Sequence, residues 1–229
     1  MKILEVFLLS TDIPASTSFY TDVLGLPVLQ ESTSAVSFKA GETILHFNQG
    51  GNIKPVYHFA FNIPSNQLEP ALEFLKTKTE VMPASGNGDL VADFKSWNAQ
   101  SFYFNDNNGN ILECIARFDL NNPATDWDPE AFILNVNEIA FVVTNIPETQ
   151  KYLLENGIPL FSKGPQTADF SVLGDEEGLI ILKDLKSGWM PNDLEPKPFE
   201  TRVIIQEDQQ AFKLNLSNES LRIEKVSKH

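Results

Sequence analysis

The clearest pattern in the chain is an apolar strand that leads into a helix-capping residue and an amphipathic helix, and it occurs three times. Aligned on Glu5, His58 and Glu138, the three strands lead to Asp12, Ser65 and Asn145. Side chains of Asp, Ser and Asn accept hydrogen bonds from the free N–H groups of a helix start, so each is a predicted N-cap. The spacing therefore predicts three strand–helix units.

Each predicted helix is followed by two or three short strands with turns between them. The last two strands of each unit fall within residues 34–48, 101–117 and 170–182. Gly25 is predicted to end the first helix as a C′ residue. A fourth unit, residues 201–226, has strand-like sequence but lacks room for a full helix. These patterns predict an α+β fold built from βαβββ modules.

Two changes in composition divide the chain. Residues 119–130 are polar and contain two prolines, and residues 187–198 contain three. The first segment is a predicted linker between a complete module pair, residues 1–118, and a degenerate second pair, residues 132–229. We expect each pair to form one mixed sheet that curls around a cleft.

Charge and composition narrow the classes of partner. The net charge is −14, with 31 acidic and 17 basic residues, which argues against binding to nucleic acids or anionic membranes. Cys114 is the single cysteine, so no intramolecular disulfide is possible, and no apolar run reaches the length of a membrane span. The first residues do not resemble a signal peptide. We expect a cytoplasmic protein, a monomer or homodimer, that acts on a small molecule.

Four side chains of metal-binding type lie within apolar strands of the first half: Glu5, His46, His58 and Glu113. Strand side chains alternate between faces, and each of the four shares its face mainly with apolar neighbours. Buried carboxylates are costly unless a cation or a proton compensates their charge. Two imidazoles and two carboxylates around one cavity would form a divalent metal site.

Each of these residues also has a structural interpretation. A histidine at a strand start can be held by a hydrogen bond alone, and Glu5 can face solvent. Trp97 follows a glycine-containing loop that could cover a pocket, or it can pack on the sheet as part of a hairpin.

Three stretches make the chain resemble the vicinal oxygen chelate superfamily, which includes glyoxalase I, extradiol dioxygenases and bleomycin-resistance proteins. They are residues 12–26, with Phe-Tyr and Leu-Gly-Leu in the helix and its end, residues 103–113, with Asp-Asn-Asn-Gly-Asn before Glu113, and residues 58–61. The resemblance implies metal slots on the first and last strands of two paired modules, at Glu5, His46, His58 and Glu113.

The slots differ in part from those of glyoxalase I, which has His or Gln first and Glu second. Extradiol enzymes use two His and one Glu from the first, third and fourth slots, and Glu5 departs from that set. His46, His58 and Glu113 would still form a two-His-one-carboxylate triad suited to iron(II). In the second half Glu138 occupies the first slot and Leu182 the second, with Arg202 and Arg222 near the others. That set predicts a scaffold with no cation site.

The resemblance implies a metal-dependent lyase or isomerase of glyoxalase type, whose substrate chelates the metal through vicinal oxygens. The cofactor would be zinc, nickel, cobalt, manganese or iron. Glu5 or Glu113 would act as general base, and Glu5 is favoured because a less firmly held carboxylate is easier to release. The alternatives are an extradiol ring-cleaving dioxygenase and a non-catalytic protein that sequesters a drug-like small molecule.

Overall fold

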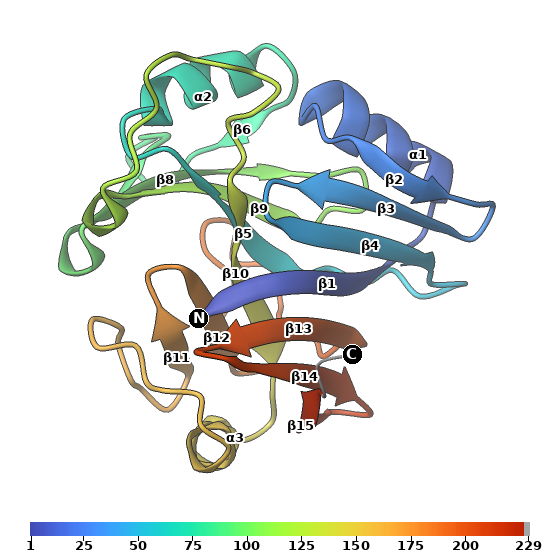
Figure 1. The fold of residues 1–229 in the computed structure, drawn as a ribbon, viewed down its shortest axis with the longest axis vertical. Helices are drawn as coiled ribbons and strands as arrows, with labels where there is room; N and C mark the ends of the chain where they lie inside the picture. Colours follow the sequence, from blue (N-terminus) through green and yellow to red (C-terminus); the bar gives the residue numbers. More distant parts are fainter. Residues whose placement is uncertain (227–229) are drawn as a thin grey trace.

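A computed structural model describes residues 1–226 of the chain, and its elements form the four modules expected from the sequence (Figure 1). The first two modules contain β1 (Lys2–Ser10), α1 (Ile13–Ser18), η1 (Phe19–Val23), β2 (Val28–Glu31), β3 (Ala35–Ala40), β4 (Thr43–Gln49), β5 (His58–Ile63), α2 (Leu68–Lys76), β6 (Val81–Met82), β7 (Ala92–Phe94), η2 (Lys95–Trp97), β8 (Ala99–Asn105), β9 (Ile111–Arg117) and η3 (Phe118–Leu120). The last two contain β10 (Asn135–Val142), α3 (Ile146–Glu155), β11 (Phe170–Asp175), β12 (Gly178–Lys183), β13 (Thr201–Glu207), β14 (Gln210–Ser217) and β15 (Ser220–Val226).

The strands form two mixed sheets, which confirms the predicted α+β class. Sheet A has the strand order β15-β14-β13-β1-β4-β3-β2, and sheet B has the order β11-β12-β10-β5-β9-β8-β6, with β7 paired to β8. In Figure 1 sheet A runs from the light blue β2 through β1 to the red β15.

The pairing between modules differs from the one we expected. Each sheet joins a module of the first half to a module of the second, because β1 pairs antiparallel with β13 and β5 pairs antiparallel with β10. Both sheets therefore take strands from each side of residues 119–131. The division of the chain into units 1–118 and 132–229 stays a prediction.

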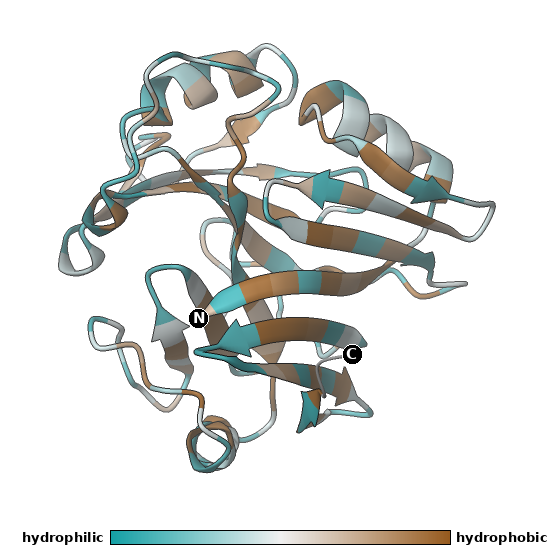
Figure 2. Cartoon of the chain, viewed as in Figure 1, coloured by the Kyte–Doolittle hydropathy of each residue, from teal (hydrophilic) through white to brown (hydrophobic). Residues whose placement is uncertain are grey.

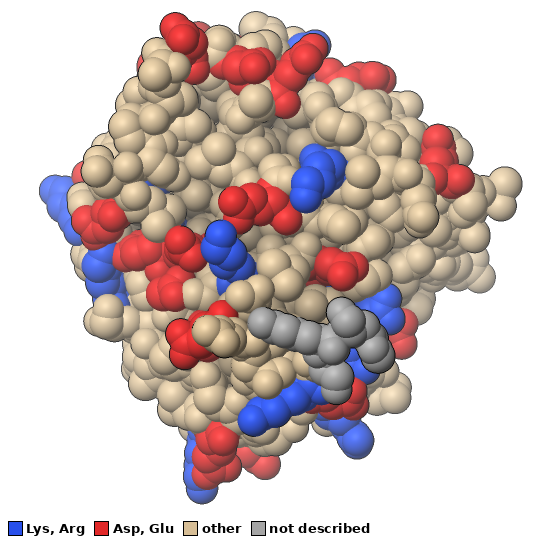
Figure 3. Space-filling view, in the orientation of Figure 1, with Lys and Arg blue, Asp and Glu red and all other residues tan. Residues whose placement is uncertain are grey.

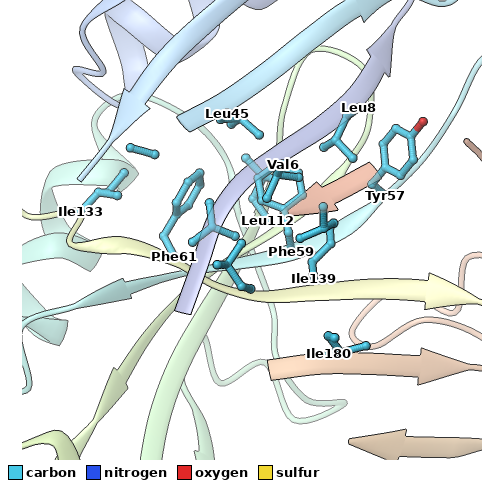
Figure 4. Packing of buried hydrophobic residues seen from close by; sticks show 14 of the residues in the cluster. Val6, Leu8, Leu45, Tyr57, Phe59, Phe61, Leu112, Ile133, Ile139 and Ile180 are labelled. Carbon is cyan, nitrogen blue, oxygen red and sulfur yellow. The ribbon is translucent and has the colours of Figure 1, made fainter. Parts of the chain in front are cut away.

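The main hydrophobic core lies between the two sheets and beneath the helices. Figure 4 shows Val6, Leu8 and Leu45 of sheet A close to Phe59, Phe61, Leu112, Ile139 and Ile180 of sheet B. The alternation that places these side chains inward is visible as bands of brown and teal along β4 in Figure 2. The opposite face of sheet B is also buried, and its side chains form two smaller clusters.

Two of the three predicted helix caps are confirmed. Asp12 accepts a hydrogen bond from the backbone N–H of Ala15, at 2.9 Å, and Asn145 accepts one from Glu148, at 3.2 Å. The prediction for Ser65 is wrong, because α2 starts later and Gln67 occupies the cap position without a side-chain bond. Gly25 follows the end of η1 with a φ of +68°, as its predicted role requires.

The segment between the second and third modules is held against the turn between β3 and β4. The backbone N–H of Glu42 donates to the carbonyl of Leu134 at 2.7 Å, and the N–H of Leu134 donates to the carbonyl of Asn62 at 2.9 Å. Gly41 makes this approach possible, since a Cβ there would lie 1.9 Å from the Leu134 oxygen.

No helix within residues 1–226 combines the length and the apolar character that crossing a membrane requires. On the face shown in Figure 3, acidic and basic side chains are interspersed.

Replacing Gly41 with Ala should test the close approach between the turn after β3 and the backbone of Leu134, which lies just before β10. Gly51 is the matched control, because it has a similar φ, +63° against +58°, but a Cβ added there would meet nothing within 4 Å. We expect Gly51→Ala to cost about 1 kcal/mol from backbone strain alone, and Gly41→Ala to cost about 1–3 kcal/mol more from the steric overlap. Urea unfolding measures both, and equal losses would contradict the contact.

Candidate metal centre

Three potential metal ligands converge on the buried outer face of sheet B. His58 lies on β5, Glu113 on β9 and Glu138 on β10, and one donor atom from each lies within 4.8 Å of the others. The strand register explains the convergence, because Ala60 of β5 pairs with Glu113 on one side and with Glu138 on the other. Ala60 itself carries only a methyl group between these two positions.

The protonation state of His58 follows from its hydrogen bond. Its Nδ1 lies 3.0 Å from the carbonyl oxygen of Ile111, which can only accept, so Nδ1 carries the proton and donates it. Burial lowers the pKa of His58 to about 4, so the ring is neutral near pH 7. The lone pair of Nε2 is therefore free, and this atom lies 3.6 Å from Oε2 of Glu113.

Both carboxylates are buried, and Arg117 forms an ion pair with one of them, Glu138. Burial, and after it the negative charge of Glu138, raises the pKa of Glu113 to about 8. Burial also raises the pKa of Glu138, although its ion pair with Arg117 opposes this. Among residues 1–226, Glu113 is thus the carboxylate without a cationic partner in direct contact, and it holds its proton near neutral pH.

Arg117 is the centre of a buried charge network. Its side chain is fully buried, and it donates to Glu138, to Asn137 at 2.5 Å and to Glu176 at 3.1 Å. The guanidinium carbon lies 5.3 Å from the ring centre of Trp97, in a cation–π contact. These contacts fix the guanidinium, and through it the carboxylate of Glu138.

The three candidate ligands line a cavity of about 310 Å³. The other lining side chains are mainly aromatic or apolar, with Trp189 only 5.3 Å from the His58 ring. A larger groove of about 620 Å³ lies between the start of β1 and residues 120–135, but no histidine of the described part of the chain, residues 1–226, lines it. The chemistry of the donor set identifies the smaller cavity as the candidate site.

The four residues predicted from the sequence lie in two pairs on two different sheets. His58 and Glu113 are buried on sheet B, whereas Glu5 and His46 are partly exposed on sheet A. Within residues 1–226 the group of three ligands contains neither Glu5 nor His46. The four-residue site therefore stays a prediction, and the structure groups two of its members with Glu138.

His46 already uses both of its ring nitrogens. Nε2 lies 3.0 Å from the Glu5 carboxylate and Nδ1 lies 2.8 Å from the hydroxyl of Ser37. A carboxylate accepts, so Nε2 donates to Glu5, and the hydrogen bond between Nδ1 and the Ser37 hydroxyl satisfies the other nitrogen. The ring also stacks on Phe7, with centroids 4.1 Å apart. This pair is satisfied without a cation, in contrast to His58.

The sequence analysis did not predict Glu138 as a candidate metal ligand, or Arg117 as its ion-pair partner. Glu138 occupies the first-strand slot of the third module, but we expected that half to lack a cation site. The strand register also corrects the residue that we assigned to the second metal slot of the second half, Leu182. Glu113 pairs with Ala60, two residues after His58, and Ile181 pairs with Ala140, two residues after Glu138. Ile181, rather than Leu182, is thus equivalent to Glu113, and Leu182 points into the main core.

The donor set fits a divalent metal ion. One neutral imidazole nitrogen and two carboxylates, all buried, have ligand chemistry suited to Zn, Fe or Mn. A cation there would also offset carboxylate charge that Arg117 alone does not balance.

Known proteins share this fold and part of this sequence. A family model described as the Glyoxalase/Bleomycin resistance protein/Dioxygenase superfamily matches residues 2–114. Metallothiol transferase FosB of Staphylococcus haemolyticus is 35% identical over 109 residues, which cover 45% of this chain and 74% of the relative. FosB of Staphylococcus epidermidis is 34% identical over the same length.

One solved structure spans both halves of the chain. The crystal structure of a putative dioxygenase from Bacillus subtilis aligns with a TM-score of 0.60, at 16% identity, over 98% of this chain and 84% of that one. The chain therefore belongs to the glyoxalase/bleomycin resistance protein/dioxygenase superfamily, as its resemblance to vicinal oxygen chelate proteins predicted.

Replacing Glu113 with Gln should stabilise the metal-free protein at alkaline pH. The raised pKa means that folded Glu113 keeps its proton from about pH 4.5 to about pH 8, while the unfolded chain has lost it. The wild type therefore loses stability across this range relative to the variant, which does not titrate at this position. We expect the melting temperature of the variant to be higher at pH 8.5 by at least ~2–4 °C, the shift that about 1 kcal/mol gives in a chain of this size. Thermal unfolding in EDTA from pH 4.5 to 8.5 measures the difference, and parallel curves would contradict a buried, uncompensated Glu113.

Proposed function

We propose that the chain is a metal-dependent lyase or isomerase whose metal is held by His58, Glu113 and Glu138. The observation that carries the proposal is the convergence of three buried ligands within 4.8 Å at the wall of a cavity. The free Nε2 lone pair of His58 supports it, because a ligating imidazole needs its other nitrogen to donate elsewhere, as Nδ1 does to Ile111.

The composition of the site favours manganese, iron or zinc. Carboxylates suit harder cations such as manganese, whereas imidazole suits iron and zinc. A bound divalent ion would act as a Lewis acid that polarises an oxygen of the substrate. The three ligands would leave other positions for the vicinal oxygens of that substrate.

The residues around the site have separable roles. Arg117 fixes Glu138, which makes Glu138 the firmer of the two carboxylates. Glu113 lacks such an anchor. Once a bound metal has displaced its own proton, it would be the carboxylate better placed to accept a proton from the substrate. Tyr103 lines the same cavity, and burial raises the pKa of its hydroxyl well above the usual value. It therefore stays protonated and is available as a donor to a substrate oxygen.

The relatives support the coarser part of this proposal. FosB is named as a metallothiol transferase, and it shares about a third of its aligned residues with the first half of this chain. The second half contributes Glu138, which lies outside the residues matched by the family model. The particular reaction is therefore proposed from the site.

The metal ligands can be tested by comparing two sets of variants. We expect near-stoichiometric binding of Mn²⁺ or Zn²⁺ to the wild type, and a loss of affinity of about 100-fold or more when His58→Ala or Glu138→Gln removes one ligand. Glu5→Gln and His46→Ala are the controls and should leave affinity unchanged. Isothermal titration calorimetry and elemental analysis give the readout. If the Glu5 and His46 variants lose the metal instead, the four-residue set of the sequence is favoured over this one.

Proton abstraction by Glu113 can be tested with hydroxyacetone, a small molecule with vicinal oxygens. We expect the metal-loaded protein to exchange the hydrogens next to the carbonyl for deuterium in D₂O, as followed by NMR. Glu113→Gln, assayed at a metal concentration that calorimetry shows to saturate the variant, should slow the exchange by about 100-fold or more, because the amide cannot accept a proton. Metal binding without exchange above the rate of free metal would favour a non-catalytic binding protein.

A further inference from the structure

Aromatic side chains form most of the cavity wall. Phe94, Trp97, Tyr103, Phe170 and Trp189 line it, from β7, η2, β8, β11 and the segment between β12 and β13. Ile181, Pro165 and Met190 add apolar surface. Aromatic walls favour a flat, apolar ligand, because rings stack face to face or edge to face with gains beyond their buried area.

The cations near the cavity are already paired with carboxylates. Arg117 is bound to Glu138 and Glu176, and Lys163 is bound to Asp119 and Glu176. Lys183 is paired with Asp184 at 3.1 Å. No lysine or arginine within residues 1–226 is among the residues that line the cavity. A divalent metal with Arg117 and Lys163 would carry four positive charges, and the carboxylates of this network, Glu113, Glu138, Glu176 and Asp119, carry four negative ones. No net positive charge would therefore remain for an anionic substrate.

We propose that this cavity takes an uncharged aromatic substrate, whose ring contacts Trp97 and Trp189 while its oxygens face His58, Glu113 and Glu138. A phosphonate or another multiply charged anion is disfavoured, because it would enter a buried site that offers no cationic side chain. The placement of the oxygens rests on the proposed function, whereas the placement of the ring rests on the cavity wall alone.

Trp189 determines specificity in this arrangement. It is 5% exposed and lies beside His58, at the position where a ring attached to a metal-binding group would pack. Its backbone N–H donates to Leu194 and its carbonyl accepts from Asp193, so the local fold holds it in place. Removing its side chain should weaken contact with the ring while the metal ligands remain.

Three probes with vicinal oxygens separate these contributions. 2-Hydroxyacetophenone carries a ring, hydroxyacetone carries the same oxygens without the ring, and 1,2-dihydroxypropylphosphonic acid carries a charge. For the Mn²⁺-loaded protein we expect 2-hydroxyacetophenone to bind about tenfold or more tightly than either of the others, since burying a ring contributes about that much. Calorimetry measures the affinities. Equal binding of the first two, or tighter binding of the phosphonate, would overturn the proposal.

Variants locate the ring contact. Trp189→Ala should reduce affinity for 2-hydroxyacetophenone by about tenfold, with little change for hydroxyacetone or Mn²⁺. Trp127→Leu is the matched control, because the third tryptophan packs against Phe74 and Phe132, outside the cavity lining. Phe170→Arg, which adds a cation to the partly exposed wall, should improve phosphonate binding and weaken 2-hydroxyacetophenone binding. Unchanged preferences in both cavity variants would refute the assignment.

Acetophenone distinguishes a failure of this proposal from a failure of the proposed function. It has the ring but no adjacent hydroxyl, and it can be titrated into metal-free protein while tryptophan fluorescence is followed. Binding that Trp189→Ala abolishes would support the aromatic site even if no metal binds. Metal binding without any effect of acetophenone would support the metal centre and overturn the aromatic substrate class.

Discussion

The antiparallel pairing of β5 with β10 is the constraint on which the candidate site depends. It places the first strand of the second module beside the first strand of the third, with Ala60 in register with Glu138. The parallel pairing of β5 with β9 places Glu113 in register with the same Ala60. Two carboxylates from different modules thus meet across one small side chain. A shift of one residue in either ladder would turn a carboxylate into the main core.

Burial of these carboxylates imposes a charge requirement on their surroundings. Two ionised groups in a low-dielectric site repel each other, and one cation balances only one of them. Arg117 supplies that cation from the end of β9, held between Asn137, Glu176 and the rings of Trp97 and Phe161. The remaining carboxylate, Glu113, keeps a proton or requires a metal. The contacts of Arg117 therefore hold Glu138 in place, and they leave Glu113 as a buried carboxylate that a divalent ion could bind.

The sequence was sufficient to predict the modules but not the way they pair. Strand alternation, the caps at Asp12 and Asn145 and the repeated slots are local patterns, and local geometry determines them. The pairing of β1 with β13 joins residues about 200 positions apart in the chain. No local pattern distinguishes that partner from β5, since each of the two strands has one apolar face that can pack against the core. Two of the predicted ligands, His58 and Glu113, share a module and lie together. The prediction of Glu5 and His46 as their partners assumed that the first two modules share one sheet.

Equivalent His–Glu pairs on the two sheets differ in how the charge of the carboxylate is compensated, because they differ in burial. Glu5 and His46 occupy in the first module the positions that His58 and Glu113 occupy in the second, two residues apart in register. On sheet A the imidazole donates to the glutamate, and water reaches both, with side-chain exposures of 21% and 37%. On sheet B the imidazole donates instead to a backbone carbonyl, and the exposures fall to 8% and 3%. Hydration compensates the first carboxylate, whereas only a proton, an arginine or a metal can compensate the second. The two His–Glu pairs therefore differ in their requirement for a positive charge because they differ in burial. On sheet B, β10 lies beside the pair of His58 and Glu113, and it adds a second buried carboxylate, Glu138.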